Sequence, residues 1–245
     1  MRNIWTIARR EYALYFNSPL AYTVMLIILT ITGFVFALNI WFLSSQAGFG
    51  GFAPDAGMIT GLWWVYLFTV PTLTMRLIAD EQRMGTIELL LTAPLRESEL
   101  VIGKWLGAFL FMLTTILFTF VFVIMLHRLT TPGIDQIQML SGYLGLILFV
   151  ASLLALGTGI SALFHNQFAA FFITLIVFIV LWFLIGAPAD IMTSGGDLFR
   201  YLSMGTHFDA FQSGAVALTD IIYFLSLTAL GLVIGITSIE TRRWR

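Results

Sequence analysis

Long uncharged apolar runs constrain this chain more than any other feature. A helix that crosses the hydrocarbon core of a bilayer needs about 20 apolar residues, because each adds about 1.5 Å. Inside lipid every backbone polar group must be satisfied internally, which a helix achieves. Six segments have this length and character: residues 19–43, 58–79, 105–126, 141–164, 168–188 and 218–239. The sequence therefore predicts an all-α integral membrane protein with six transmembrane helices, folded as one domain over residues 1–245.

The composition agrees with a membrane domain and excludes several other classes of function. Charged residues make up 10% of the chain, whereas soluble domains carry about 25%. A net charge of −1 gives no indication of a nucleic-acid partner. The absence of cysteine excludes disulfides, thiolate metal sites and cysteine nucleophiles. The three histidines lie far apart in the sequence, so we expect no zinc site.

The sequence also lacks a nucleotide-binding loop of its own. A P-loop needs a lysine followed by serine or threonine, so that backbone amides and the hydroxyl meet the phosphates and Mg²⁺. Lys104 is followed by Trp105 and opens an apolar run. The Thr-Ser-Gly-Gly-Asp run at 193–197 superficially resembles an ATPase signature sequence. We reject it, because it lies on the outer side of the membrane when both termini are cytoplasmic. We expect no cofactor in this chain and no enzymatic activity.

The distribution of basic residues predicts the orientation of the spans, because arginine and lysine are retained on the cytoplasmic side. With both termini in the cytoplasm, Arg128 and Arg200 are outside. The other ten are then inside: Arg2, Arg9, Arg10, Arg76, Arg83, Arg96, Lys104, Arg242, Arg243 and Arg245. The opposite topology inverts this bias. The sequence therefore predicts a multi-pass protein with both termini cytoplasmic.

The first residues form an amphipathic pattern ahead of the first span. Within 2–17, one helical face is predicted to be apolar and the other polar. The apolar face holds Ile4, Trp5, Ala8, Tyr12, Tyr15 and Phe16, and the polar face holds Arg2, Thr6, Arg9, Arg10 and Asn17. Such a pattern is typical of a helix in the membrane interface. A simple anchor and a lever that transmits force from a cytoplasmic partner are both open, and composition favours the anchor.

The connection between the second and third spans, residues 80–104, is the longest cytoplasmic segment in this topology. Gly85 can end the second span, Thr86 can cap a short new helix and Pro94 can stop it. Ser98 can then cap the third span. The segment thus predicts a short cytoplasmic helix between two membrane helices.

This short helix has an apolar face and charged surroundings. The apolar face consists of Ile87, Leu90 and Leu91, and the charges are Arg83, Glu88, Arg96, Glu97 and Glu99. A docking surface for a partner protein and an ordinary solvated loop remain equally open on the residues alone. Only the docking interpretation predicts that removing the leucine face uncouples a partner.

Several features of the spans predict how they pack. Small residues four apart let helices approach closely, within the chain or less often at a subunit interface. They are Gly103 and Gly107; Ala151, Ala155 and Gly159; and Gly231 and Gly235. Pro71 should kink the second span. The segment 189–219 is too long for a plain turn, so it holds either re-entrant or interfacial helices or a surface cap.

Almost no ionisable residue is expected at mid-depth in the membrane. Arg76, Asp80 and Glu81 fall at one end of the second span, and His127 and Arg128 at the outer end of the third. Ion-coupled secondary transporters usually carry charges at mid-depth. The pattern therefore favours energy supplied from elsewhere.

The segment 80–104 resembles the ABC-2 permease family. The residues that carry the likeness are Glu81, Gly85, Thr86, Glu88, Leu89, Leu90, Pro94, Glu99, Gly103 and Lys104. The resemblance extends from Arg9, Arg10 and Glu11 to the C-terminal Thr-Arg-Arg-Trp, and residues 202–224 are similar to the gliding-motility type of that family. It implies a permease in the bacterial cytoplasmic (inner) membrane.

The resemblance also implies partners and site residues. It implies a dimer, homo- or heteromeric, whose second-to-third-span loop docks on a separate cytoplasmic ATPase that binds ATP and Mg²⁺. Membrane lipids and a periplasmic accessory protein are the other expected partners. By resemblance, Glu81, Gly85, Thr86, Glu88 and Pro94 belong to the coupling region, to which the residue pattern adds Arg83 and Leu91. The turn at His165, Asn166 and Gln167 is a smaller second contact.

The predicted function is thus a permease subunit that couples ATP hydrolysis by a partner to export of an undetermined substrate. One alternative is a mechanical or scaffold subunit that acts on a periplasmic partner without transport. An ion-coupled secondary transporter is a further alternative, disfavoured by the lack of mid-membrane charge.

Overall fold

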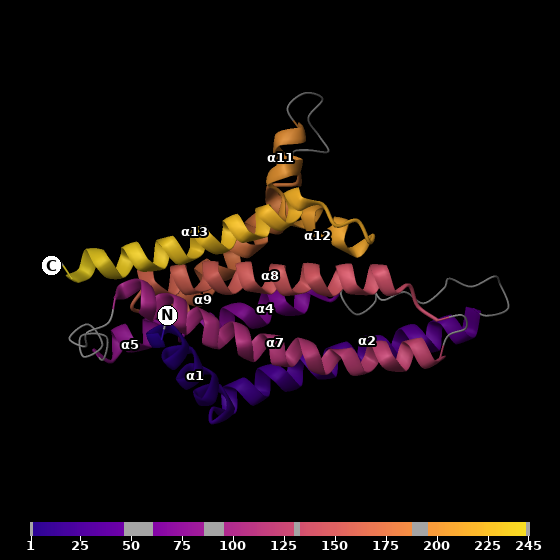
Figure 1. Cartoon of the computed structure of the whole chain (residues 1–245), viewed down its shortest axis with the longest axis horizontal. Coiled ribbons are helices and arrows are strands. Elements are labelled where there is room, and N and C mark those ends of the chain that lie inside the picture. Colours follow the sequence, from indigo (N-terminus) through magenta and orange to yellow (C-terminus); the bar gives the residue numbers. More distant parts are fainter. Residues whose placement is uncertain (1, 47–60, 86–95, 130–132, 188–195, 244–245) are drawn as a thin grey trace.

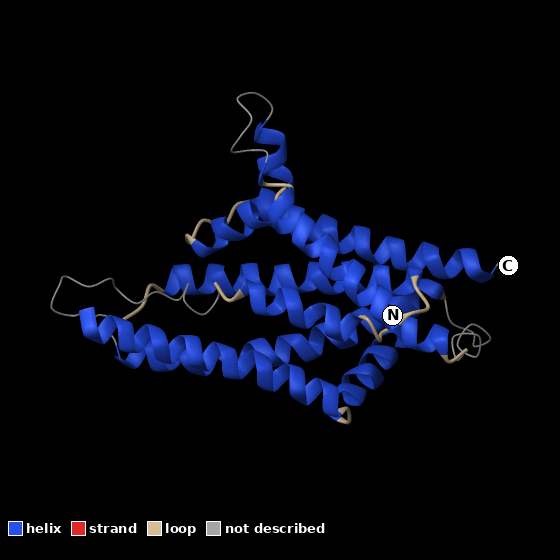
Figure 2. Ribbon diagram, turned by 180° about the vertical axis from the view of Figure 1, so that it is seen from behind, coloured by secondary structure: helices blue, strands red, loops and turns tan. Residues whose placement is uncertain are grey.

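A computed structural model describes residues 2–46, 61–85, 96–129, 133–187 and 196–243, and every regular element in these ranges is a helix (Figures 1 and 2). The first four helices are α1 (Arg2–Phe16), α2 (Pro19–Gln46), α4 (Trp63–Thr74) and α5 (Ala79–Arg83). The long helices α7 (Glu97–Leu129) and α8 (Gln136–Leu163) follow. The remaining elements are α9 (Gln167–Ile179), its π-helical continuation η1 (Val180–Leu184), α11 (Gly196–Leu202), α12 (Met204–Gln212) and α13 (Leu218–Arg243).

Five helices of the described chain are long and apolar enough to cross a membrane. They cover Ala21–Trp41, Glu97–Leu129, Gln136–Leu163, Gln167–Leu184 and Leu218–Thr241. These correspond to the first, third, fourth, fifth and sixth predicted spans, which confirms an all-helical membrane protein. The third is longer than predicted, because its helix begins at Glu97. Ser98 therefore lies in the first turn instead of at the cap, and the Glu99 carboxylate accepts the backbone N–H of Arg96 at 3.2 Å.

The predicted second span, residues 58–79, is represented by a shorter helix. α4 has 12 residues, fewer than the about 20 that a crossing needs. It continues through Pro71 and ends at Thr74, where the Met75 N–H bonds the Pro71 carbonyl. A turn at Met75–Ile78 then leads into α5. The chain at 58–60 lies outside the described residues, so the full length of this span stays a prediction.

The long helices run side by side, and both termini and α5 lie toward one end of the molecule (Figure 1). α8 lies at the centre, with 83% of its apolar span buried by the rest of the chain. Its main neighbour is α13, which it meets through Ala155, Gly159 and Gly231. A Cβ atom on Gly231 would overlap the backbone of Ala155 and Leu156. These small residues therefore pack helices within the chain, as expected.

Aromatic side chains fill the core on the other side of α8. Phe149 of α8 lies against Trp182 of η1 and Phe208 of α12, with ring centroids 5.4 and 5.2 Å apart. Trp182 also stacks on Trp63 of α4 at 3.7 Å. The cluster fixes α4, η1 and α12 on one face of α8, because offset and edge-on aromatic contacts stabilise beyond their buried area.

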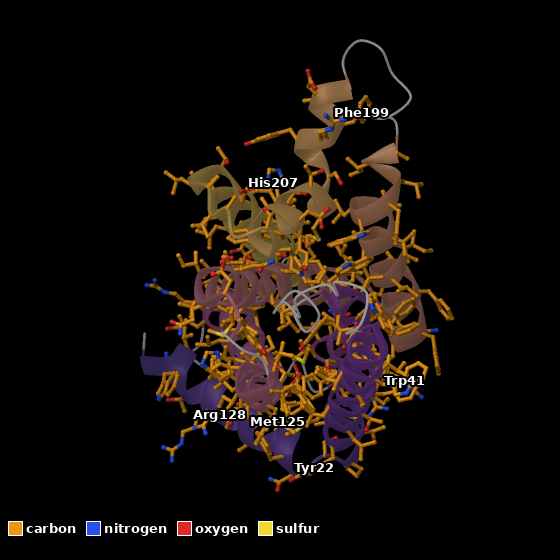
Figure 3. All side chains as sticks on the ribbon, turned by 90° about the vertical axis from the view of Figure 1, so that its right-hand side faces the viewer. Tyr22, Trp41, Met125, Arg128, Phe199 and His207 are labelled. Carbon is orange, nitrogen blue, oxygen red and sulfur yellow. The ribbon has the colours of Figure 1, made fainter. Side chains whose placement is uncertain are left out.

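The predicted outer segment contains two short helices, α11 and α12. Figure 3, seen from the end opposite the termini, shows Phe199 and His207 in a layer above the long helices. His207 is buried, and its Nδ1 lies 2.6 Å from an Asp220 oxygen at the start of α13. Its Nε2 lies 2.6 Å from the Tyr201 carbonyl. A carboxylate partner for His207 was not predicted, because 13 residues separate the pair.

Candidate functional site

A buried ionic triad joins three helices at the end of the bundle that holds the termini. The Lys104 ammonium of α7 lies 3.0 Å from a Glu11 carboxylate oxygen of α1 and 2.7 Å from a Glu81 oxygen of α5. The exposed fractions of the three side chains are 3% for Lys104, 14% for Glu11 and 23% for Glu81. Each helix thus contributes one charged group to a shared contact.

The triad depends on a close approach of α1 to α7. A Cβ atom on Gly103 would meet the Ile7 side chain, and one on Gly107 would meet the Glu11 side chain and the Ala8 carbonyl. These two glycines therefore bring Glu11 to the level of Lys104, one residue beyond Gly103. Farther along, the Tyr12 and Thr114 hydroxyls lie 3.1 Å apart, and Tyr15 stacks on Phe111.

The orientation of α1 differs in part from the predicted amphipathic faces. Its side toward α7 includes Ala8, which is fully buried, and Tyr12 and Tyr15, as the pattern predicted. Trp5, predicted on the apolar face, is 58% exposed, and Glu11 points inward to Lys104. The apolar side is therefore largely occupied by protein. The position of α1 in a membrane interface stays a prediction.

The electrostatics of the triad make Lys104 its essential member. Burial raises the pKa of the Glu81 carboxyl above its ordinary value of 4.5, and the Lys104 ammonium opposes that rise. Taking ions out of water costs several kcal/mol each, and close opposite charges offset that cost. Without Lys104, two carboxylates would share a mostly buried site without a cation between them. The ammonium therefore holds α1 and α5 to α7.

A second set of contacts ties α5 to the turn between α8 and α9. The Gln167 side-chain amide donates to the Asp80 carboxylate, and the Gln82 amide donates to the Ala162 carbonyl at 2.8 Å. The Ser161 hydroxyl accepts the backbone N–H groups of Ile78 and Ala79 at 3.3 and 3.1 Å. The segment 80–104 and the turn at 165–167, which the sequence predicted as two separate contacts for a partner, thus meet at α5.

The predicted coupling residues are divided between described and undescribed parts of the chain. Glu81 belongs to the triad, Arg83 is exposed at the end of α5, and Gly85 has a φ of +70° in the turn after it. A left-handed residue after a helix favours glycine, as predicted. Thr86, Glu88, Leu91 and Pro94 lie outside the described residues.

The residues predicted as a second contact lie in the described turn between α8 and α9. Asn166 caps α9 by accepting the Phe168 N–H at 2.9 Å, His165 is exposed, and Gln167 reaches α5. Of these three, the structure brings Gln167 into contact with the coupling segment. A contact of these residues with a partner protein stays a prediction.

Glu11 and Lys104 were not predicted as a pair. The sequence predicted Lys104 just before a span that begins at residue 105, where a lysine side chain can reach water. Because α7 begins at Glu97, Lys104 lies two turns inside the helix. A buried ionisable side chain needs a partner. The signal available in the sequence was therefore the presence of acidic residues, Glu11 and Glu81, that a folded bundle could bring to Lys104. No group of three or more His, Asp or Glu residues in the described chain could hold a metal ion.

Comparisons with known proteins bear on the same region. The family described as "ABC-2 family transporter protein" matches residues 68–242, which include Glu81, Lys104 and the described helices from α7 to α13 except for the last residue of α13. A probable ABC transporter permease protein, NosY of Pseudomonas aeruginosa, is 34% identical over 110 residues, covering 42% of this chain and 38% of that protein. The aligned part is less than half of that relative's length. The family match spans most of the chain, and the protein therefore belongs to the ABC-2 family of transporter proteins.

Proposed function

We propose that this chain is the permease subunit of an ABC transporter and that a separate cytoplasmic ATPase drives it through the segment 80–104. A second permease subunit completes the membrane unit, in a bacterial cytoplasmic membrane with both termini inside. The placement in the gliding-motility type, and a periplasmic partner, belong to the same proposal. The partner subunit, not this chain, binds ATP and Mg²⁺.

The observation that carries the proposal is the Glu11–Lys104–Glu81 triad. It links α5, which directly precedes the predicted docking helix, to α7 and α1 through ionic contacts that are mostly buried. A force applied to α5 therefore reaches the cytoplasmic halves of two helices without passing through a flexible loop. The bonds from α5 to Gln167 and Ala162 extend the same connection to α8 and α9. This arrangement supports transmission of motion from one contact point to several spans.

The described chain has a second buried ionisable pair, His207 and Asp220 at the start of α13, but the larger group, the triad, lies where a cytoplasmic partner would act. The triad joins α1 and α7 to α5, and α5 lies at the end of the bundle that holds the termini (Figure 1). An ion pathway is usually marked by ionisable groups near mid-depth. A triad at one end is suited to holding helices together where a cytoplasmic partner docks.

Substituting the predicted docking residues tests the proposal. We expect Glu88→Arg and Leu91→Arg to insert normally but to reduce stimulation of the partner ATPase to its basal rate, because charge and apolar contact at the docking face are both lost. The measurement is co-purification of the ATPase with the wild-type chain, followed by its hydrolysis rate. Leu198→Arg on α11 is the matched control, since it makes the same change at an exposed leucine distant from α5. Normal binding and stimulation by both docking variants would show the assignment to be wrong.

A further inference from the structure

A cavity of about 270 Å³ lies beside the triad, between α1, the turn after α4, α5 and α7. Lys104, Glu11 and Glu81 form part of its wall. The lining also includes Arg10 and Leu14 of α1, Arg76 and Leu77 of the turn after α4, and Asp80 of α5. Pockets for small ligands usually measure about 300–1,000 Å³, so this cavity is at the small end of that range. It therefore suits a small polar group better than a whole lipid or a peptide helix.

The charged side chains that line the cavity differ in the partners that they contact. The Lys104 ammonium is shared by two carboxylates. Arg10 and Arg76 are both exposed, and the Arg10 guanidinium lies near enough to Glu81 to lower the pKa of that carboxyl. The Asp80 carboxylate accepts a hydrogen bond from the Gln167 side-chain amide. The cavity thus presents two guanidinium groups and a carboxylate to whatever occupies it.

Several leucines also line the cavity, which lies where helix ends meet. Leu73 and Leu77 are buried on the α4 side, and Leu14 of α1 is 48% exposed. Lipid headgroups lie at the level where transmembrane helices end, and pockets with basic residues between helices on the cytoplasmic side bind lipid phosphates. Arginine suits this task because its planar guanidinium pairs with two phosphate oxygens at once.

We propose that this cavity binds the phosphoethanolamine headgroup of an aminophospholipid. Arg10 and Arg76 hold the phosphodiester, and Asp80 accepts hydrogen bonds from the primary ammonium. Leu14 contacts the glycerol end, where the acyl chains leave the cavity. The inference goes beyond the proposed function and uses only its membrane orientation. A bound headgroup would join α1 to the α4–α5 turn beside the triad.

The charge pattern makes the site selective among lipids. Phosphatidylcholine carries the same two charges, but its quaternary ammonium has no N–H to donate to Asp80. Phosphatidylglycerol has no positive charge to meet the acidic side of the cavity. Since either competitor lacks the hydrogen bond between the ammonium and Asp80, the ethanolamine lipid should bind at least about tenfold more tightly than either one at the same chain length.

The test is lipid binding to the purified full chain in detergent, read by native mass spectrometry. Short-chain phosphatidylethanolamine, phosphatidylcholine and phosphatidylglycerol are titrated separately. We expect Arg10→Gln and Arg76→Gln each to weaken binding of the ethanolamine lipid about tenfold. Asp80→Asn should remove the preference over phosphatidylcholine. Arg9→Gln is the matched control, because Arg9 is the neighbouring arginine on α1 and lines a different groove with Trp5 and Tyr12.

Each other result would overturn the inference in a distinct way. Equal binding of all three lipids, or equal losses in Arg9→Gln and Arg10→Gln, would show a nonspecific surface. Competition by inorganic phosphate as strong as by the lipid would show a site for a free anion. Loss of the co-purifying ATPase in Arg10→Gln and Arg76→Gln, with lipid binding unchanged, would show a protein docking surface. Failure of lipid binding with normal ATPase stimulation would leave the proposed function standing.

Discussion

Replacing Lys104 with methionine is expected to destabilise the protein by about 3–5 kcal/mol, the usual effect of removing one member of a buried ionic group. The change keeps much of the side-chain volume but leaves Glu11 and Glu81 without their shared cation. Two carboxylates that are mostly buried would then repel each other or take up protons. The measurement is the free energy of unfolding in detergent micelles, with the wild type as reference.

Two further variants separate charge from packing at this site. Lys104→Arg keeps the positive charge and should retain most of the stability. The triple variant Glu11→Gln, Glu81→Gln, Lys104→Met removes all three charges and should recover much of the loss, since a neutral replacement of a buried ionic group is often tolerated. If Lys104→Met unfolds like the wild type, the triad does not hold α1 and α5 to α7.

Gly231→Ala is expected to cost about 2–3 kcal/mol, at the upper end of overpacking effects. The added methyl group would meet the backbone of Ala155 and Leu156 in α8. Backbone atoms cannot rotate away as a flexible side chain can, so α13 must separate from α8. The expected result is a lower unfolding temperature together with faster proteolysis of the α13 end.

Gly205→Ala is the matched control for this substitution. It makes the same change inside helix α12, but its methyl group would lie 3.6 Å or more from the nearest atoms of Trp182 and Ser203. Because alanine favours helices over glycine, this variant should be neutral or slightly stabilising. Equal destabilisation by the two variants would contradict close α8–α13 packing as the reason for Gly231.

Long apolar runs predicted most of the spans because the bilayer dictates their length. The last predicted span, 218–239, corresponds to α13 at Leu218–Arg243, and the fourth, 141–164, to α8 at Gln136–Leu163. The extra residues include polar and charged ones, Gln136 and Gln138 in α8 and Glu240 to Arg243 in α13, and a search for uninterrupted apolar character stops at them. For the same reason the start of α7 at Glu97 was missed by eight residues.

The candidate site was predicted in part, and the reason lies in sequence distance. Glu81 was identified because the continuous segment 80–104 resembles the coupling region of the ABC-2 permease family. Glu11 and Lys104 are 93 residues apart, and no local pattern places one against the other. Their meeting depends on Gly103 and Gly107, whose spacing predicted a close helix contact but not its partner, α1.

The central claim is that α5 and the segment after it face the cytoplasm, where an ATPase can act on them. The chain contains no cysteine, so single cysteines report the side of the membrane without a background. Met84 at the end of α5 and Leu198 of α11 are 65% and 62% exposed. The direct measurement is labelling of Met84→Cys and Leu198→Cys with a membrane-impermeant maleimide, before and after the cytoplasmic membrane is opened. The account predicts that Leu198→Cys reacts in both states and Met84→Cys only after opening, whereas reaction of Met84→Cys from the outside would contradict it.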